Sequence, residues 1–132
     1  MIVDLDDGTA LYANTGGQDF DPSRPGVVLI HGAGCDHTTW RGQTRYLAHH
    51  GFSPLAIDLP GHGRSGGKHG ETIEARSEAV LGLLDALDVE RAVVVGHSMG
   101  SLAALDLAGR WPARASGLVL VATSPRMAVH PV

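Results

Sequence analysis

One serine of this chain stands where a protein would place a nucleophile. Ser98 lies between two glycines, Gly96 and Gly100. The apolar run before it, 93–95, is typical of a buried strand, and the run after it, 101–108, is typical of a helix. A serine at such a turn is lifted above the edge of a sheet, and glycines are needed where strand and helix pass close together. The pattern predicts a nucleophilic serine beside the positive end of a helix, which would stabilise a developing oxyanion.

The elements that must position this serine follow from the alternation of apolar and amphipathic runs. This alternation predicts an α/β fold, a mainly parallel sheet with helices on both faces. We find no repeat and no linker, so residues 1–132 are interpreted as one partial domain with six strands. The first two strands are expected to form an antiparallel hairpin. The expected strands are 2–5, 11–14, 27–30, 54–58, 93–95 and 117–122, and the expected helices are 38–50, 71–88 and 101–108.

Composition excludes several classes of function. The chain has 132 residues, 43% of them hydrophobic, and a net charge of −4 without a basic cluster, so neither nucleic acid nor an anionic membrane surface is an expected partner. No apolar run approaches the roughly 20 residues of a membrane-spanning helix, and the first residues do not resemble a signal peptide. Cys35 is the single cysteine, which fits a cytoplasmic location. Neither a metal site nor a phosphate-binding or dinucleotide-binding loop is indicated by residue spacing, so no cofactor is expected.

Two further loops carry small and polar residues at the predicted carboxyl ends of strands. These are His31-Gly32-Ala33-Gly34 and the run Asp58-Leu59-Pro60-Gly61-His62-Gly63-Arg64-Ser65. Ligands bind at this edge of open α/β sheets. Together with Gly96-His97-Ser98-Met99-Gly100, and in this order, the loops resemble the amino-terminal half of an α/β-hydrolase-fold enzyme, without the family's C-terminal strands and cap.

The resemblance implies a role for each motif residue. Ser98 would be the nucleophile, and the backbone N–H groups of Met99 and Ala33, with Gly34 as the neighbouring candidate, would form the oxyanion hole. His31, Gly32, Gly96, His97 and Gly100 would shape the loop and the turn, as would the residues of the 58–65 loop. The remaining histidines, His37 among them, are expected to be exposed. The tight turn at 31–34 is also compatible with a purely structural role.

The partners that activate a serine are missing after the last predicted strand. In this family an acid and then a histidine follow the serine in the chain, but 123–132 contains no Asp or Glu and one histidine, His130. An orienting carboxylate for His130 is not indicated. The strand 117–122 is also expected to be an unpaired apolar edge, which invites pairing with another chain. We therefore expect a second polypeptide or a second copy of this chain to cover it.

Two functions remain open from the sequence. The first is a serine hydrolase that acts on a small ester or lactone by acyl transfer through Ser98, seen as an amino-terminal fragment or as the nucleophile half of a split enzyme. The second is a catalytically silent half-fold that serves as an interaction module. The missing acid and histidine favour the second for the isolated chain, whereas the intact Ser98 turn favours the first for an assembly.

Overall fold

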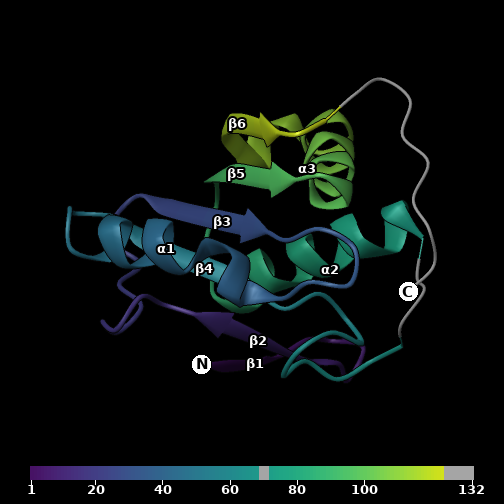
Figure 1. The fold of residues 1–132 in the computed structure, drawn as a ribbon, viewed down its shortest axis with the longest axis horizontal. Helices are drawn as coiled ribbons and strands as arrows, with labels where there is room; N and C mark the ends of the chain where they lie inside the picture. Colours follow the sequence, from purple (N-terminus) through teal and green to yellow (C-terminus); the bar gives the residue numbers. More distant parts are fainter. Residues whose placement is uncertain (69–71, 124–132) are drawn as a thin grey trace.

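A six-stranded sheet forms the centre of the molecule, in the order β1-β2-β4-β3-β5-β6 (Figure 1). The computed structural model describes residues 1–68 and 72–123. The strands are β1 (Ile2–Asp4), β2 (Ala10–Asn14), β3 (Gly26–Ile30), β4 (Ser53–Ile57), β5 (Ala92–His97) and β6 (Ala115–Val121). Each strand predicted from the sequence is present, with bounds that differ by one or a few residues.

Strand directions confirm the predicted architecture. β1 and β2 form an antiparallel hairpin, and β2 joins the sheet antiparallel to β4. The pairs β3–β4, β3–β5 and β5–β6 are all parallel. Because parallel strands end at the same edge, the segments that follow β3, β4 and β5 meet at one edge of the sheet. The three sequence motifs therefore lie along a common edge.

The predicted helix 38–50 is divided in the structure. It consists of a 3₁₀ turn, η1 (His37–Trp40), and the helix α1 (Arg41–Ala48). The Asp36 carboxylate accepts a hydrogen bond of 2.9 Å from the Thr38 backbone N–H. This cap begins the 3₁₀ turn one residue earlier than the apolar periodicity indicates. The chain leaves α1 through Gly51, whose φ of 88° suits a glycine.

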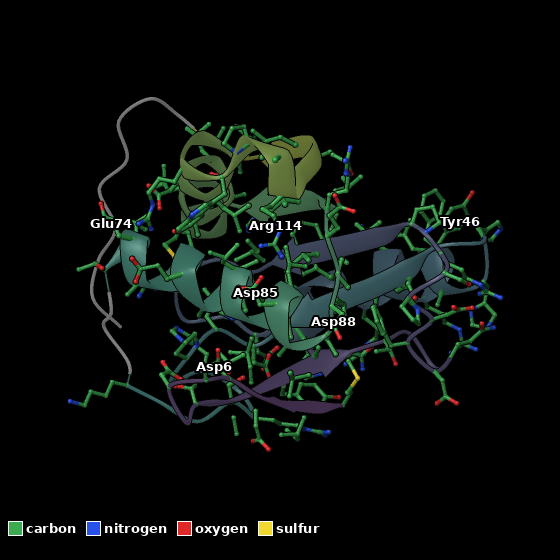
Figure 2. The ribbon with its side chains drawn as sticks, turned by 180° about the vertical axis from the view of Figure 1, so that it is seen from behind. Asp6, Tyr46, Glu74, Asp85, Asp88 and Arg114 are labelled. Atoms are coloured by element: carbon green, nitrogen blue, oxygen red, sulfur yellow. The ribbon has the colours of Figure 1, made fainter. Side chains whose placement is uncertain are left out.

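The other two helices follow β4 and β5. Helix α2 (Ile73–Ala86) begins after Thr72, whose Oγ1 accepts a hydrogen bond of 3.0 Å from the Ala75 N–H and so caps the helix. Helix α3 (Met99–Arg110) follows Ser98 directly, and the 3₁₀ turn η2 (Pro112–Arg114) leads into β6. Figure 2 shows Arg114 beside Asp85 of α2, where the two side chains form an ion pair of 2.8 Å.

The helices cover the two faces of the sheet unequally. α1 lies in front of β3 and β4, and α2 and α3 lie behind the sheet (Figure 1). The larger core is on the α2 and α3 face, and a smaller one is on the α1 face around Val27, Leu29, Trp40 and Ala56. Among the helices of the described residues, none combines the length and apolar character that crossing a membrane requires.

Candidate active site

Ser98 has a backbone conformation that L-amino acids rarely adopt. Its φ is 54° and its ψ is −118°, at the junction of β5 and α3. Conformations of this kind cost about 1–3 kcal/mol and persist only where neighbouring contacts enforce them. Here the Ser98 N–H donates a hydrogen bond of 2.9 Å to the Val121 carbonyl, and the Ser98 carbonyl accepts one of 2.9 Å from the Ser101 N–H. The strained turn is therefore clamped from β6 on one side and from α3 on the other.

The two glycines of the turn stand where no side chain fits. A Cβ atom at Gly96 would lie 2.6 Å from the Cα of Ser101, and a Cβ atom at Gly100 would lie 2.8 Å from the carbonyl carbon of Ile30. Both obstacles are backbone atoms, which cannot rotate away. The close crossing of β5, α3 and the end of β3 therefore depends on both glycines.

The loop after β3 lies beside the serine. A Cβ atom built on Gly32 would be 3.4 Å from the Cβ of Ser98 and 3.4 Å from the Nδ1 of His97. The Cys35 N–H donates to the Gly32 carbonyl over 3.2 Å, which closes the loop into a turn. The structure thus brings together two motifs that are about 65 residues apart in the sequence.

The candidate oxyanion donors belong to these two segments. Met99 is the first residue of α3, so its N–H has no carbonyl acceptor within the helix. Its side chain is fully buried and fixes the start of the helix in the core. Ala33 follows Gly32 in the loop and is half-buried, whereas Gly34 is exposed and has a φ of 69°.

His31 connects two loops of the edge and is fully buried. Its Nδ1–H donates to the Gly32 carbonyl over 2.7 Å, and its Nε2 accepts from the Leu59 N–H over 3.0 Å. Burial lowers the pKa of His31, and an Nε2 that accepts an N–H bond must be unprotonated. Both nitrogens are engaged, so this ring holds loops together. The His62 ring lies beside it, with a centroid separation of 5.1 Å.

The His97 ring lies beside Gly32 of the loop after β3 and also reaches Trp40 at the end of η1. Its ring meets the Trp40 ring edge-on, with centroids 6.2 Å apart. Within the described residues, the buried Nδ1 of His97 and the buried Nε1 of Trp40 have no hydrogen-bond partner.

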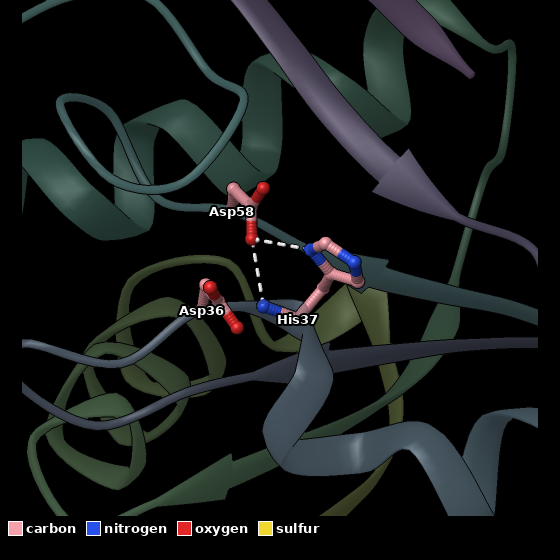
Figure 3. A group of neighbouring side chains, drawn as sticks. All are labelled: Asp36, His37 and Asp58. Carbon is pink, nitrogen blue, oxygen red and sulfur yellow. Dashed lines mark hydrogen bonds and ion pairs between the residues drawn. The ribbon is translucent and has the colours of Figure 1, made fainter.

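A cluster that residue spacing does not reveal lies at the end of β4 (Figure 3). Asp58 is fully buried, and its Oδ1 accepts bonds from the backbone N–H and the ring Nδ1–H of His37, over 2.6 and 2.9 Å. Its Oδ2 accepts a bond of 2.8 Å from the Arg64 N–H. The expectation that His37 is exposed was wrong: its side chain is 15% exposed, because Asp58 draws it inward. This carboxylate braces the turn after β3 against the loop after β4.

The same cluster has the residue types of a metal site. Asp36, His37 and Asp58 each offer one ligand atom within 4.8 Å of the others. However, both oxygens of Asp58 already accept N–H bonds, and the Nδ1 of His37 is one of the donors. Hydrogen bonds from Thr38 also lower the pKa of Asp36 and hold its carboxylate. A cation would have to displace these bonds, so the geometry favours a structural brace.

The His37–Asp58 pair has the form of an oriented base but is remote from the serine. The His37 ring lies 4.9 Å from the ring of Tyr12 in β2. β2 is three strands away from β5 in the sheet, which is roughly 14 Å at the usual strand spacing. His37 therefore does not serve Ser98. His130 lies outside the described residues.

The chain belongs to the α/β-hydrolase fold family. The family model matches residues 25–131. The chain is 42% identical over 109 residues to the pimeloyl-[acyl-carrier protein] methyl ester esterase of Aromatoleum aromaticum, covering 83% of this chain and 41% of that protein. It is 38% identical over 96 residues to a putative non-heme haloperoxidase of Mycobacterium phage D29, covering 72% and 34%.

Solved structures show the same relation. The enol-lactonase from Burkholderia xenovorans LB400 superposes with a TM-score of 0.78 and 34% identity, covering 89% of this chain and 45% of that one. The chain thus spans less than half the length of these relatives. The enol-lactonase shares the fold described above, and each of the three relatives has a longer chain.

Proposed function

We propose that this chain carries the nucleophile of a serine hydrolase that acts on an ester or lactone of a small molecule. The observation that carries the proposal is the clamped, strained backbone of Ser98 at the β5–α3 junction, with the Gly32 loop beside it. Strain of this kind is typical of functional sites, and the names of the relatives (an esterase and an enol-lactonase) agree with the reaction class.

The proposed reaction is acyl transfer. The Ser98 Oγ attacks the carbonyl carbon, a base accepts the hydroxyl proton, and the tetrahedral oxyanion is stabilised by the N–H groups of Met99 and Ala33, with Gly34 as the neighbouring candidate. The intermediate collapses, the alcohol leaves with the proton from the base, and water then hydrolyses the acyl-enzyme. This chemistry needs no metal or organic cofactor. With one exposed cysteine, Cys35, the protein fits a reducing compartment such as the cytoplasm.

The base and its carboxylate belong, in this proposal, to polypeptide outside the described residues. His31 and His37 are the histidines of the β3 loop, and both are committed to structural hydrogen bonds. This observation also favours a second candidate, a catalytically silent interaction module that keeps the Ser98 turn for its structure alone.

A fluorophosphonate probe separates the two functions when it is applied to the assembly that contains the polypeptide with the base, because the probe reacts with serines that are activated for acyl transfer. We expect labelling at Ser98, located by peptide mass spectrometry, to disappear in Ser98→Ala. It should persist in Ser116→Ala, which changes an exposed serine of β6. A folded assembly that the probe does not label would support the silent module instead.

A further inference from the structure

A polar cleft of about 430 Å³ lies at the carboxyl end of β4, beside the brace that Asp58 forms. Its walls come from β2, the turn η1, the first residue of α1 and the loop after β4. The lining residues are Asn14, Asp36, His37, Thr38, Arg41, Gly63 and Arg64. In the sheet, β2 and β4 lie on the side of β3 that is opposite to β5. A ligand in this cleft would therefore lie away from the proposed nucleophile.

Two arginines of the cleft carry charges that no carboxylate of the described residues balances by an ion pair. Arg41 and Arg64 are both exposed, and within that part of the chain their guanidinium groups form neither an ion pair nor a hydrogen bond. Carboxylates are not scarce, because the chain has 14 acidic side chains against 10 lysines and arginines. Four other arginines do pair with carboxylates: Arg24, Arg91, Arg110 and Arg114. Two such guanidinium groups at one cleft of an acidic protein indicate a site for an anion.

Arg64 is held in place by an aromatic ring and by its own backbone. Its guanidinium carbon lies 5.2 Å from the centre of the Tyr12 ring, and its backbone N–H donates to the buried Asp58 over 2.8 Å. The Tyr12 ring in turn contacts the ring of His37. A guanidinium group that stacks on a ring face keeps the N–H groups at its edge available for an oxyanion. Because the group is held before binding, it loses less side-chain entropy when an anion arrives.

The carboxylates near the cleft are already engaged by other groups. Asp58 is fully buried, and both of its oxygens accept N–H bonds. The Oδ1 of Asp36 accepts from the backbone N–H and the hydroxyl of Thr38, over 2.9 and 2.5 Å. The second ring nitrogen of His37 is turned away from Asp58 (Figure 3). Asp36 is the only acidic residue among the lining residues, against two guanidinium groups, so the lining has a net positive charge.

We propose that this cleft binds the phosphate group of a small molecule, held between Arg41 and Arg64. The planar fork of a guanidinium group matches two oxygens of a phosphate, and each such bond is charge-assisted. A phosphate dianion balances both arginines, whereas a single carboxylate balances one. The volume of the cleft is within the range of small-molecule sites, so it has room for the phosphate and a small organic part. The inference holds whether or not Ser98 is active.

The test follows the binding of inorganic phosphate to the whole chain by ¹H–¹⁵N spectra, at constant pH and at an ionic strength held constant with sodium chloride. We expect the backbone N–H signals of Thr38 and Arg64 to shift and to saturate. Arg41→Gln and Arg64→Gln should each raise the dissociation constant roughly fivefold or more. Arg45→Gln is the matched control, because Arg45 is an exposed arginine one turn further along α1 and outside the cleft. It should change the constant less than twofold.

A variant of the opposite sign keeps the test independent of lost contacts. Asp36→Asn removes the one carboxylate of the lining, and asparagine caps a helical turn as well as aspartate does. It should tighten phosphate binding, whereas Asp4→Asn, an exposed change on β1, should not. Circular dichroism confirms that each variant is folded.

Glycerol phosphate then distinguishes the sources of the phosphate group. Tighter binding than that of inorganic phosphate would show that the organic part also contacts the cleft, and equal binding would show that free phosphate is sufficient. Shifts that grow linearly without saturation would overturn the proposal. Equal weakening by Arg45→Gln and Arg41→Gln would do the same, since the attraction would then be a general effect of charge.

Discussion

At the scale of single residues, the site depends on positions where a larger side chain would collide with backbone atoms. Gly96 and Gly100 allow the backbone of β5, α3 and β3 to approach one another, and the Ser98 conformation follows from that approach. His31 and Asp58 then hold the neighbouring loops through buried hydrogen bonds. The hydrogen-bond partners of His31 and Asp58 therefore determine what these two side chains do in the fold.

We predict that Gly96→Ala destabilises the fold strongly. The new Cβ would lie 2.6 Å from the Cα of Ser101, and overpacking against backbone costs typically 1–3 kcal/mol or more. Gly109→Ala is the matched control: a Cβ there meets nothing within 4 Å, and alanine is the better helix former by up to about 1 kcal/mol. Urea unfolding checks both. Equal midpoints for the two variants would contradict the close crossing.

We also predict a pH dependence of stability that is due to His31. Burial lowers the pKa of His31 below its ordinary value of 6.5. The unfolded chain therefore binds a proton that the folded chain does not. The stabilisation is complete above about pH 6.5 and is lost as the pH falls through the lowered pKa. The carboxylates with lowered pKa values, such as Asp36, titrate below 3.8 and act outside this window.

The measurement is the urea midpoint between pH 7.5 and pH 5. We expect His31→Asn to be less stable at neutral pH but to lose less stability on acidification than the native chain. His49→Asn, which changes an exposed histidine, should retain the native slope. Parallel curves for the native chain and His31→Asn would show that His31 is not the responsible group.

At the scale of elements, a polar network fastens α2 to the C-terminal half of α3. The Ser77 hydroxyl is fully buried; it donates to the Asp106 carboxylate and accepts from Arg110 over 2.7 Å. Arg110 also bonds Glu78 over 3.1 Å and lies over the Trp111 ring at 4.3 Å. Because α3 begins at the Ser98 turn, the network holds the helix whose first N–H is the proposed oxyanion donor.

We predict that Ser77→Ala costs about 1–3 kcal/mol of stability, since a buried bond to a charged group is lost. Ser116→Ala, an exposed change on β6, should stay within about 0.5 kcal/mol of the native value. Chemical denaturation checks this. Equal free energies of unfolding for the two variants would show that the network contributes little to stability.

At the scale of the whole molecule, the described residues bury β3 and β4 completely but leave parts of β5 and β6 exposed. β3 and β4 are covered on both faces, but β6 is an edge strand with Val119 and Val121 exposed. The position of Ser98, clamped to the Val121 carbonyl, places the proposed nucleophile at the boundary between the buried strands and the exposed ones.

We predict that the chain by itself binds hydrophobic dye and self-associates through this boundary. Val119→Lys with Val121→Lys should reduce dye fluorescence and light scattering severalfold without changing the far-UV circular dichroism, because both side chains already face solvent. Leu105→Lys, an equally exposed change on α3, should leave both signals near the native level. An equal reduction by Leu105→Lys would assign the association to the other face.

Local patterns in the sequence were sufficient for the elements, their order and the family. Apolar periodicity and the glycine pair around Ser98 act over a few residues, so strand, turn and helix could be predicted with small errors at their ends. The division of 38–50 into η1 and α1 was missed because it depends on a single cap, Asp36.

Only the tertiary structure decided which residues meet. The pairing of His37 with Asp58, the neutral His31 between two loops and the exposure of Val119 and Val121 among the described residues all depend on the register of strands that are distant in the sequence. A histidine in a sequence does not indicate which carboxylate will face it, because that partner is chosen by sheet pairing. The residue types for the turn at Ser98 were thus determined locally, while the surroundings of that turn were determined by the packing of the whole sheet.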